Sequence, residues 1–245
     1  KYNFHVTLEH GGAPAGGRLE FYLSRILRLE RQVSVAVIGV ESGIVDWLKN
    51  SGVDIVPFDA GKKDKRQVVL VGDWPESGTA ETSRVDLMEH VVCGDTAVFL
   101  KPGIFKKGDN ATGWLPLKNK GNIAYFPDWL YHKECVAKKH ILFDGLQPRG
   151  VMDWDYYGPL ITNVFYEGQD TPDDLAAVAL AVCHSSRSDG FAAGIMLGSY
   201  NFGAGKIVLN TFNILDNVDK HPAADRLLLN LIDYAAETTE PPIAP

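Results

Sequence analysis

The last part of the sequence, residues 190–237, limits the possible folds more than any other stretch. Ala192–Phe202 is apolar and rich in strand-forming residues, and Gly203–Gly205 separates it from a second apolar run, Lys206–Phe212, as in a β-hairpin. Pro222 then suits the first position of a helix. After it, apolar residues recur at helical spacing: Leu228, Leu231, Ile232 and Ala235. Such a helix is stable only when its apolar face is packed, so the pattern predicts a helix lying on a sheet.

Residues 33–100 alternate between apolar strand-like runs and helical patterns. Four runs are expected to be strands: Val33–Val40, Asp54–Phe58, Gln67–Gly72 and Thr96–Leu100. Glu41–Asn50 and Glu81–Cys93 are expected to be helices, the second with Val85, Met88 and Val92 facing inward. Strands that alternate with helices form right-handed crossovers. The fold class is therefore expected to be α/β, with a doubly wound, flavodoxin-like and mostly parallel sheet covered by helices on both faces.

The first residues predict a different structure, an antiparallel β pair. Apolar and polar residues alternate over residues 2–8 and again over residues 19–23, which is typical of two strands with one wet face. Two strands alone are only marginally stable in water. This pair is therefore expected either to cap the following domain or to be the tail of a β-sandwich. We place a unit at 1–30 and the α/β domain at 31–245.

The middle of the chain is less regular. Lys106–Thr112 and Leu117–Gly121 are expected to be loops, and Asp128–Lys139 is expected to be a helix. Thr171–Asp174 looks like a helix start with an acidic first turn. The following residues Val178, Leu180 and Val182 instead alternate as in a strand, so periodicity leaves this segment open.

Composition excludes several classes of function. A net charge of −7 argues against a nucleic-acid or anionic-membrane surface, and no apolar run reaches the roughly 18–20 residues that span a bilayer. Three cysteines cannot all pair, and each is expected to be a small buried residue: Cys93, Cys135 and Cys183. Gly198–Lys206 lacks the phosphate-loop pattern. No cofactor is expected.

The best place for a ligand is the carboxyl end of the parallel strands, where open α/β sheets bind ligands. Asp73, Trp74 and Lys101 follow two of these strands and are candidate ligand-binding residues. Covalent catalysis at such a strand end would use Gly-x-Ser-x-Gly or its cysteine equivalent, and neither pattern occurs in the sequence. Lys101 has two interpretations, a residue that forms a Schiff base or holds an anion, and a surface lysine.

Two further groups are candidates for ligand contact. Asp153 and Asp155 flank Trp154 and precede Tyr156; paired carboxylates beside aromatic rings are typical of glycosidases, and also of hydrogen-bonded scaffolds. The second group lies on the expected helix in the middle of the chain: Trp129, His132 and Glu134. His132, Cys135, His140, Cys183 and His184 match no standard spacing of metal ligands. No metal is expected.

The order of elements, together with the motifs Gly190–Gly194, Phe202–Phe212 and His221–Pro222, resembles the class I glutamine amidotransferase-like fold. More narrowly, it is similar to the non-catalytic version found C-terminal in bacterial glycoside hydrolases and to the trimerisation domain of certain β-galactosidases. The active members use a cysteine at the strand-end elbow and a His-Pro-Glu ending. This sequence has Lys101-Pro102-Gly103 at the elbow, and Ala223 follows His221-Pro222.

The resemblance implies a catalytically silent domain in which His221 is a helix-entry residue and Leu175–Cys183 is a strand. Residues 1–24 would then be the last strands of a preceding β-sandwich, and the parent enzyme would be periplasmic or secreted. The expected function is an accessory domain of a carbohydrate-active enzyme, serving domain packing, oligomerisation or weak saccharide contact. Its partners would be preceding domains of a larger chain or further copies, with a possible saccharide and without nucleic acid or membrane.

Two alternatives remain open from the residues. The first is a small-molecule or carbohydrate hydrolase with its site at the carboxyl ends of the strands, which would require a pair of titratable groups within hydrogen-bonding distance in a closed pocket. The second is an interaction scaffold unrelated to sugars.

Overall fold

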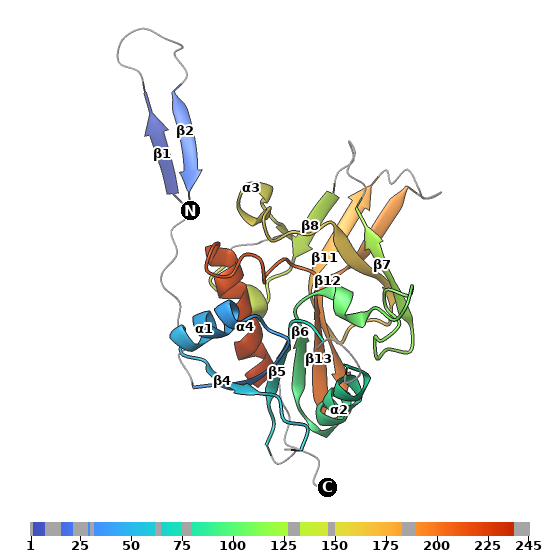
Figure 1. The fold of residues 1–245 in the computed structure, drawn as a ribbon. Helices are drawn as coiled ribbons and strands as arrows, with labels where there is room; N and C mark the ends of the chain where they lie inside the picture. Colours follow the sequence, from blue (N-terminus) through green and yellow to red (C-terminus); the bar gives the residue numbers. More distant parts are fainter. Residues whose placement is uncertain are drawn as a thin grey trace.

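The computed structural model describes residues 2–7, 16–21, 29, 32–61, 65–74, 80–126, 133–146, 150–182 and 190–237. These residues form an 11-stranded sheet with helices on it and a separate two-stranded sheet. Figure 1 shows the two-stranded sheet as an arm that extends away from the α/β body. The expected N-terminal antiparallel pair is therefore confirmed as β1 (Tyr2–Val6) and β2 (Gly17–Phe21).

The parallel part of the large sheet has the strand order β4-β3-β5-β6-β13. Its strands lie where the apolar runs predicted them: β3 (Ser34–Ile38), β4 (Asp54–Pro57), β5 (Val68–Val71), β6 (Thr96–Phe99) and β13 (Gly205–Asn210). The order runs outward from the centre in both directions, which is the doubly wound arrangement. The expected α/β fold class is confirmed.

Helices cover both faces of this parallel part. Three helices are involved: α1 (Ser42–Asn50), α2 (Ala80–Cys93) and α4 (Pro222–Glu237). Because successive strand residues point to opposite faces, Leu70 packs in the cluster with α1 and α4, whereas Val69 packs in the cluster with α2. The side chains of Leu228, Leu231 and the neighbouring apolar residues on the same face of α4 are buried, as their spacing predicted.

An antiparallel part continues the sheet beyond β13. Its strands follow in the order β12 (Phe191–Phe202), β11 (Asp174–Val182), β8 (Lys133–Ala137) and β9 (Gly150–Val151). A further pair, β10 (Val164–Gln169) and β7 (Lys120–Tyr125), joins β12 at Ile195. Since β13 pairs with residues 197–202 of the same strand, β13 and β10 lie one after the other along β12. β10 and β7 are thereby placed beyond the carboxyl end of β13.

The middle of the chain differs from its prediction. Residues 133–137 form β8, which pairs with β11, so the helix expected over Asp128–Lys139 is wrong for this part; residues 127–132 lie outside the described residues. Cys135 and Ala137 are buried on one face of β8, and this period of two fits a strand. The expected loop Leu117–Gly121 contains the start of β7. The segment left open by periodicity is the strand β11.

The inward face of α2 also differs from its prediction. Leu87 and Val91 are fully buried on the sheet, whereas Val85 is 52% and Val92 is 45% exposed. The helix has apolar residues on both sides, so local spacing selected the wrong face. Cys93 at its end is exposed, contrary to the expectation of a buried thiol, while Cys135 is buried as expected. Cys183 lies outside the described residues.

Candidate functional site

The carboxyl ends of β5 and β6 bring Asp73 and Lys101 together, as the strand-end rule predicted. The two strands are parallel neighbours, so the residues that follow them lie side by side. Lys101 Nζ lies 2.6 Å from Asp73 Oδ2, and the two side chains are 43% and 60% exposed. The carboxyl end of β3 approaches the same place through Gly39, which has φ of +56° and packs directly on the Asp73 backbone. The result is an exposed ion pair at the carboxyl ends of the central strands.

The protonation of Asp73 follows from its surroundings. Partial burial raises the pKa of this carboxyl, but the hydrogen bond from Lys101, the Trp74 backbone N–H and the charge of Lys101 together outweigh burial. The pKa of Asp73 therefore lies below its ordinary value. A carboxylate with a lowered pKa is a weak base, so this pair is poorly suited to general-base catalysis at neutral pH.

Apolar residues close the sheet end next to this pair. The short helix η1 (Pro102–Phe105) follows Lys101 and buries Ile104 and Phe105. Phe105 packs on Phe99 of β6 with ring centroids 4.6 Å apart and on Tyr166 of β10 at 6.4 Å. Hence η1 and β10 cover the strand ends with side chains.

Trp74 belongs to a row of alternating rings and cations beside the ion pair. Its indole N–H donates to the Ile104 carbonyl at 2.9 Å. The Arg84 guanidinium lies 5.0 Å from the Trp74 ring and 4.8 Å from the Trp114 ring, and Lys107 lies 4.1 Å from Trp114. Cations over indole rings contribute stabilising cation–π interactions. Arg84 and Trp114 were missed in the sequence because they come from a helix and a loop far apart in the chain.

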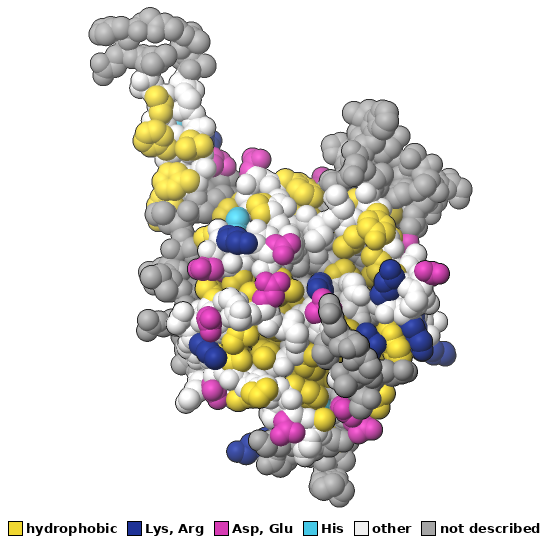
Figure 2. All heavy atoms as spheres, viewed as in Figure 1, with side chains coloured by type: hydrophobic (Ala, Val, Ile, Leu, Met, Phe, Trp, Pro, Cys, Tyr) yellow, Lys and Arg dark blue, Asp and Glu magenta, His cyan; other side chains and the backbone are white. Residues whose placement is uncertain are grey.

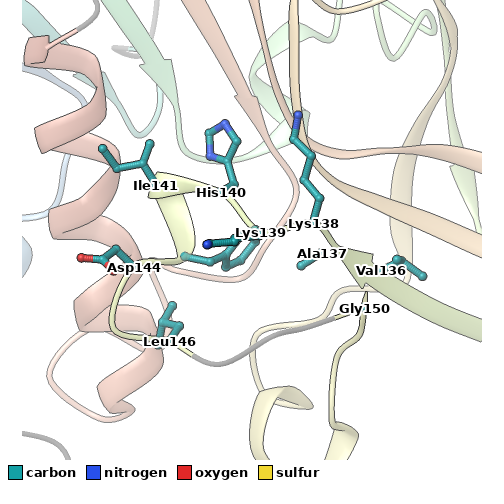
Figure 3. Close-up of a pocket in the computed structure, with 10 residues that line it drawn as sticks. Val136, Ala137, Lys138, Lys139, His140, Ile141, Asp144, Leu146 and Gly150 are labelled. Atoms are coloured by element: carbon teal, nitrogen blue, oxygen red, sulfur yellow. The ribbon is translucent and has the colours of Figure 1, made fainter.

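A second polar cluster lies beside an open pocket of about 970 Å³. Figure 3 shows Lys138 and His140 extending on the same side of the segment that follows β8. Both contact Asp174: His140 Nε2 lies 2.8 Å and Lys138 Nζ 3.2 Å from its carboxylate. The Tyr234 hydroxyl of α4 also donates to Asp174 at 3.0 Å, and Ser199 lies 2.9 Å from that hydroxyl. The cluster thus joins β11, β12, α4 and the segment after β8.

The hydrogen bonds fix the roles in this cluster. The Leu142 backbone N–H donates to His140 Nδ1, so Nε2 carries the ring hydrogen and donates it to Asp174. Burial raises the pKa of Asp174, but the hydrogen bonds from His140, Tyr234 and Lys138 outweigh burial. Together they lower the pKa of Asp174 to about 2. Burial and the Asp174 charge raise the pKa of Tyr234 to about 12. With both ring nitrogens of His140 occupied, the imidazole holds Asp174 in place and has no lone pair for a substrate proton.

The acidic and aromatic segment around Trp154 forms a short helix, α3 (Trp154–Tyr157). The Asp153 carboxylate accepts the Asp155 backbone N–H at 3.0 Å and caps this helix. Trp154 and Tyr156 pack partly on the main core. Asp153 and Asp155 therefore do not lie on one face of a strand, as a strand-borne carboxylate pair would require. Glu134 lies on β8, and Trp129 and His132 lie outside the described residues.

His221 occupies the entrance of α4. Its Nδ1 accepts the Ala223 backbone N–H at 3.2 Å, and its ring lies 5.1 Å from Tyr156. Burial lowers the pKa of His221, opposed by a hydrogen bond with the Tyr156 backbone. The side chain thus satisfies one of the free N–H groups of a helix start, which confirms the expected helix-entry role.

Within the described ranges, no group of three or more His, Cys, Asp or Glu side chains could hold a metal ion. His132, Cys183 and His184 lie outside these ranges. Among the helices in the described part of the chain, none is long and hydrophobic enough to cross a membrane.

Comparisons with solved structures find distant structural neighbours of this chain. No protein-family model matches the sequence, and no curated protein matches it. A crystal structure described as a putative ThuA-like protein from Bacteroides uniformis is 12% identical with a TM-score of 0.47; the match covers 94% of this chain and 97% of that one. A cytoplasmic protein of Salmonella typhimurium is 11% identical with a TM-score of 0.43 and 95% coverage of both chains. The α/β class stated above rests on the strand order of this chain.

Proposed function

We propose that this chain is a catalytically silent, amidotransferase-like domain with an assembly role in a carbohydrate-active enzyme. That role is domain packing, oligomerisation or weak saccharide contact. The observation that carries the proposal is the ion pair at the strand ends: where a nucleophile would follow β6, Lys101 contacts Asp73, whose lowered pKa makes it a weak base. His221, at the position of the histidine in active relatives, is engaged as a helix cap.

The link to carbohydrate-active enzymes comes from the sequence motifs of the last fifty residues and is part of the same proposal. The arrangement of the chain in two units, 1–30 and 31–245, also belongs to it. It is supported by the arm in Figure 1, whose strands pair with each other and extend from the body.

Two assays test the proposal. The purified chain is offered chromogenic glutaminase, esterase and glycosidase substrates, and a panel of neutral and acidic oligosaccharides is screened by thermal shift. We expect no turnover and, at most, a small rise in Tm with one class of saccharide. Turnover that is lost in both Lys101→Ala and Asp73→Asn would instead establish a hydrolase at the strand ends. A Tm unmoved by every saccharide would remove saccharide contact from the proposed role and leave domain packing or oligomerisation.

A further inference from the structure

The side chains that follow β8 alternate in direction, and this alternation sets one lysine apart from its neighbours. The backbone is extended at His140, with φ of −146° and ψ of 149°, and successive side chains of an extended backbone point to opposite sides. Lys138 and His140 both contact Asp174. Lys139 lies between them and therefore points away from Asp174. Within the described part of the chain, no hydrogen bond or ion pair engages Lys139.

Lys139 points into a pocket built by its own stretch of the chain. After β8 the chain forms the short helix η2 (Ile141–Phe143) and comes back to pair with β8 through β9, where Ala137 lies opposite Gly150. The described residues of this stretch line the open pocket of about 970 Å³, which we name the loop pocket. Figure 3 shows the Lys139 ammonium inside the ring of lining residues, whereas the Asp144 carboxylate points away from it. A ligand in the pocket therefore meets the positive charge.

The walls of the loop pocket are largely apolar. Val136, Ile141, Phe143 and Leu146 are among the lining residues, and the Ile141 side chain is 47% exposed. Binding sites for small molecules are concave and mostly apolar, with a few polar groups that orient the ligand, and commonly enclose roughly 300–1,000 Å³. The loop pocket has this composition and this size. Figure 2 shows that the surface also carries charged side chains of both signs, so the anion preference comes from the pocket and not from the surface as a whole.

Contacts behind the loop pocket hold it in shape. Asn230 of α4 donates through Nδ2 to the Leu142 carbonyl at 3.0 Å and to the Asp144 carbonyl at 2.9 Å. Phe143 packs on the buried Phe212 with ring centroids 6.2 Å apart. A pocket that is already ordered loses little conformational freedom when a ligand enters, which favours affinity.

We propose that the loop pocket binds a small organic carboxylate whose remaining part is partly apolar. The carboxylate contacts the Lys139 ammonium, and the apolar part packs on Ile141 and Leu146. An inorganic anion leaves these walls in water, and a neutral apolar molecule leaves the lysine unpaired, so neither matches both features. Aromatic acids and uronic acids share the required chemistry. The site is separate from the ion pair of Asp73 and Lys101, and the inference goes beyond the proposed function without resting on it.

A titration followed in ¹H–¹⁵N NMR spectra of the intact chain tests the inference. The probes are two acids with their uncharged counterparts, phenylacetate with phenylacetamide and glucuronate with glucose, together with inorganic phosphate. We expect at least one acid to shift the amide signals of residues 138–146 and to bind at least about fivefold more tightly than its uncharged counterpart. Which acid binds separates an aromatic ligand from a sugar acid. Added salt should weaken the binding, because the lysine is exposed to solvent.

A variant isolates the charge of the lysine. Lys139→Met keeps the length of the side chain and removes its ammonium, so the affinity for the acid should fall by at least about fivefold. The matched control is Lys118→Met, at another exposed lysine, which should leave the affinity unchanged. Ile141→Ala should weaken binding by about threefold through loss of apolar contact. An unchanged Tm in both lysine variants shows that any loss is one of binding and not of folding.

Three outcomes overturn the inference. The first is that neither acid shifts the signals of residues 138–146. The second is that inorganic phosphate binds there as tightly as the acids, which would mean that an exposed lysine merely attracts anions. The third is that Lys139→Met binds the acid as well as the unchanged chain does. None of these results involves turnover at the strand ends, so the catalytic assays judge the proposed function separately.

Discussion

The two ends of strand β6 carry opposite kinds of charge pair. At the amino end, His90 and Asp95 are 2% and 6% exposed, and His90 Nδ1 lies 3.0 Å from Asp95 Oδ2. At the carboxyl end, Lys101 and Asp73 form a pair that water reaches freely. The first pair fastens α2 to the sheet, while the second lies where α/β sheets bind ligands. The amino end of β6 is thus held rigidly by a buried ion pair, whereas the carboxyl end carries an exposed pair whose side chains can rearrange.

Both members of the buried pair, His90 and Asp95, make further hydrogen bonds to the backbone. His90 Nε2 donates to the Ala60 carbonyl at 3.0 Å, and the Asp95 carboxylate also accepts the Gln67 backbone N–H at 2.9 Å. The pair therefore joins α2, the start of β6 and the chain leading into β5. Removing one member leaves a buried polar group without its partner, which is much more costly than removing an exposed charge.

The largest effect is expected from breaking the buried pair. His90→Ala should lower the free energy of unfolding by about 3–5 kcal/mol, because Asp95 then stays buried without its partner. Urea denaturation followed by circular dichroism measures the change. A loss under about 1 kcal/mol would contradict the assignment of this end as the rigid one.

A smaller loss is expected from the glycine that closes the carboxyl end. Gly39 has φ of +56°, and a Cβ there would lie 2.1 Å from the Asp73 carbonyl oxygen. Gly39→Ala should therefore cost about 1–3 kcal/mol and shift the Asp73 backbone. The control is Gly43→Ala in α1, where an added Cβ meets nothing within 4 Å; denaturation of both variants should separate them clearly.

The two aspartates should titrate on opposite sides of the ordinary value of 3.8. Burial raises the pKa of Asp95, although Gln67 and His90 partly offset it. The Asp95 contribution to stability is thus present at low pH and is lost as pH rises through its folded pKa. The pKa of Asp73 is lowered, so its contribution is present above 3.8 and is lost as pH falls. Carboxyl ¹³C shifts measured between pH 2 and 6 report both midpoints; the reverse order would refute the contrast.

The smallest effect is expected at the exposed pair. Lys101→Ala should change the free energy of unfolding by no more than about 1 kcal/mol, since exposed ion pairs gain little and are screened by salt. A double-mutant cycle with Asp73→Asn at low and high salt isolates the interaction. A coupling that is large and insensitive to salt would mean that this end is as rigid as the other.

Local sequence patterns predicted those helices and strands whose apolar periodicity is visible within their own residues. The parallel strands and α4 show their period within a few residues, and the strand-end rule then places Asp73 beside Lys101. The face of α2 was not predictable because both of its sides are apolar, and the choice of Leu87 and Val91 depends on the sheet beneath them. β8 was missed because its partner β11 lies about forty residues further on.

The cluster at Asp174 was not predictable for a similar reason. His140 and Tyr234 are 34 and 60 residues away from it in the chain. Each is an ordinary residue in its own segment, and only the meeting of β11 with α4 gives them a common partner. The acidic segment at Asp153, whose composition indicated ligand contact, forms a capped helix whose backbone the composition did not predict.

The meeting of β13 and β10 along β12 has a consequence for solubility. A simple sheet has two edges, but among the described residues this one ends at three strands, β4, β9 and β7, and each edge offers backbone groups to another chain. Two of them are blunted: β9 has only two residues, and β4 ends at Pro57, which has no N–H to donate. β7 is longer and carries Tyr125 with 66% exposure. It is therefore the edge at which strand-to-strand aggregation of this protein should begin.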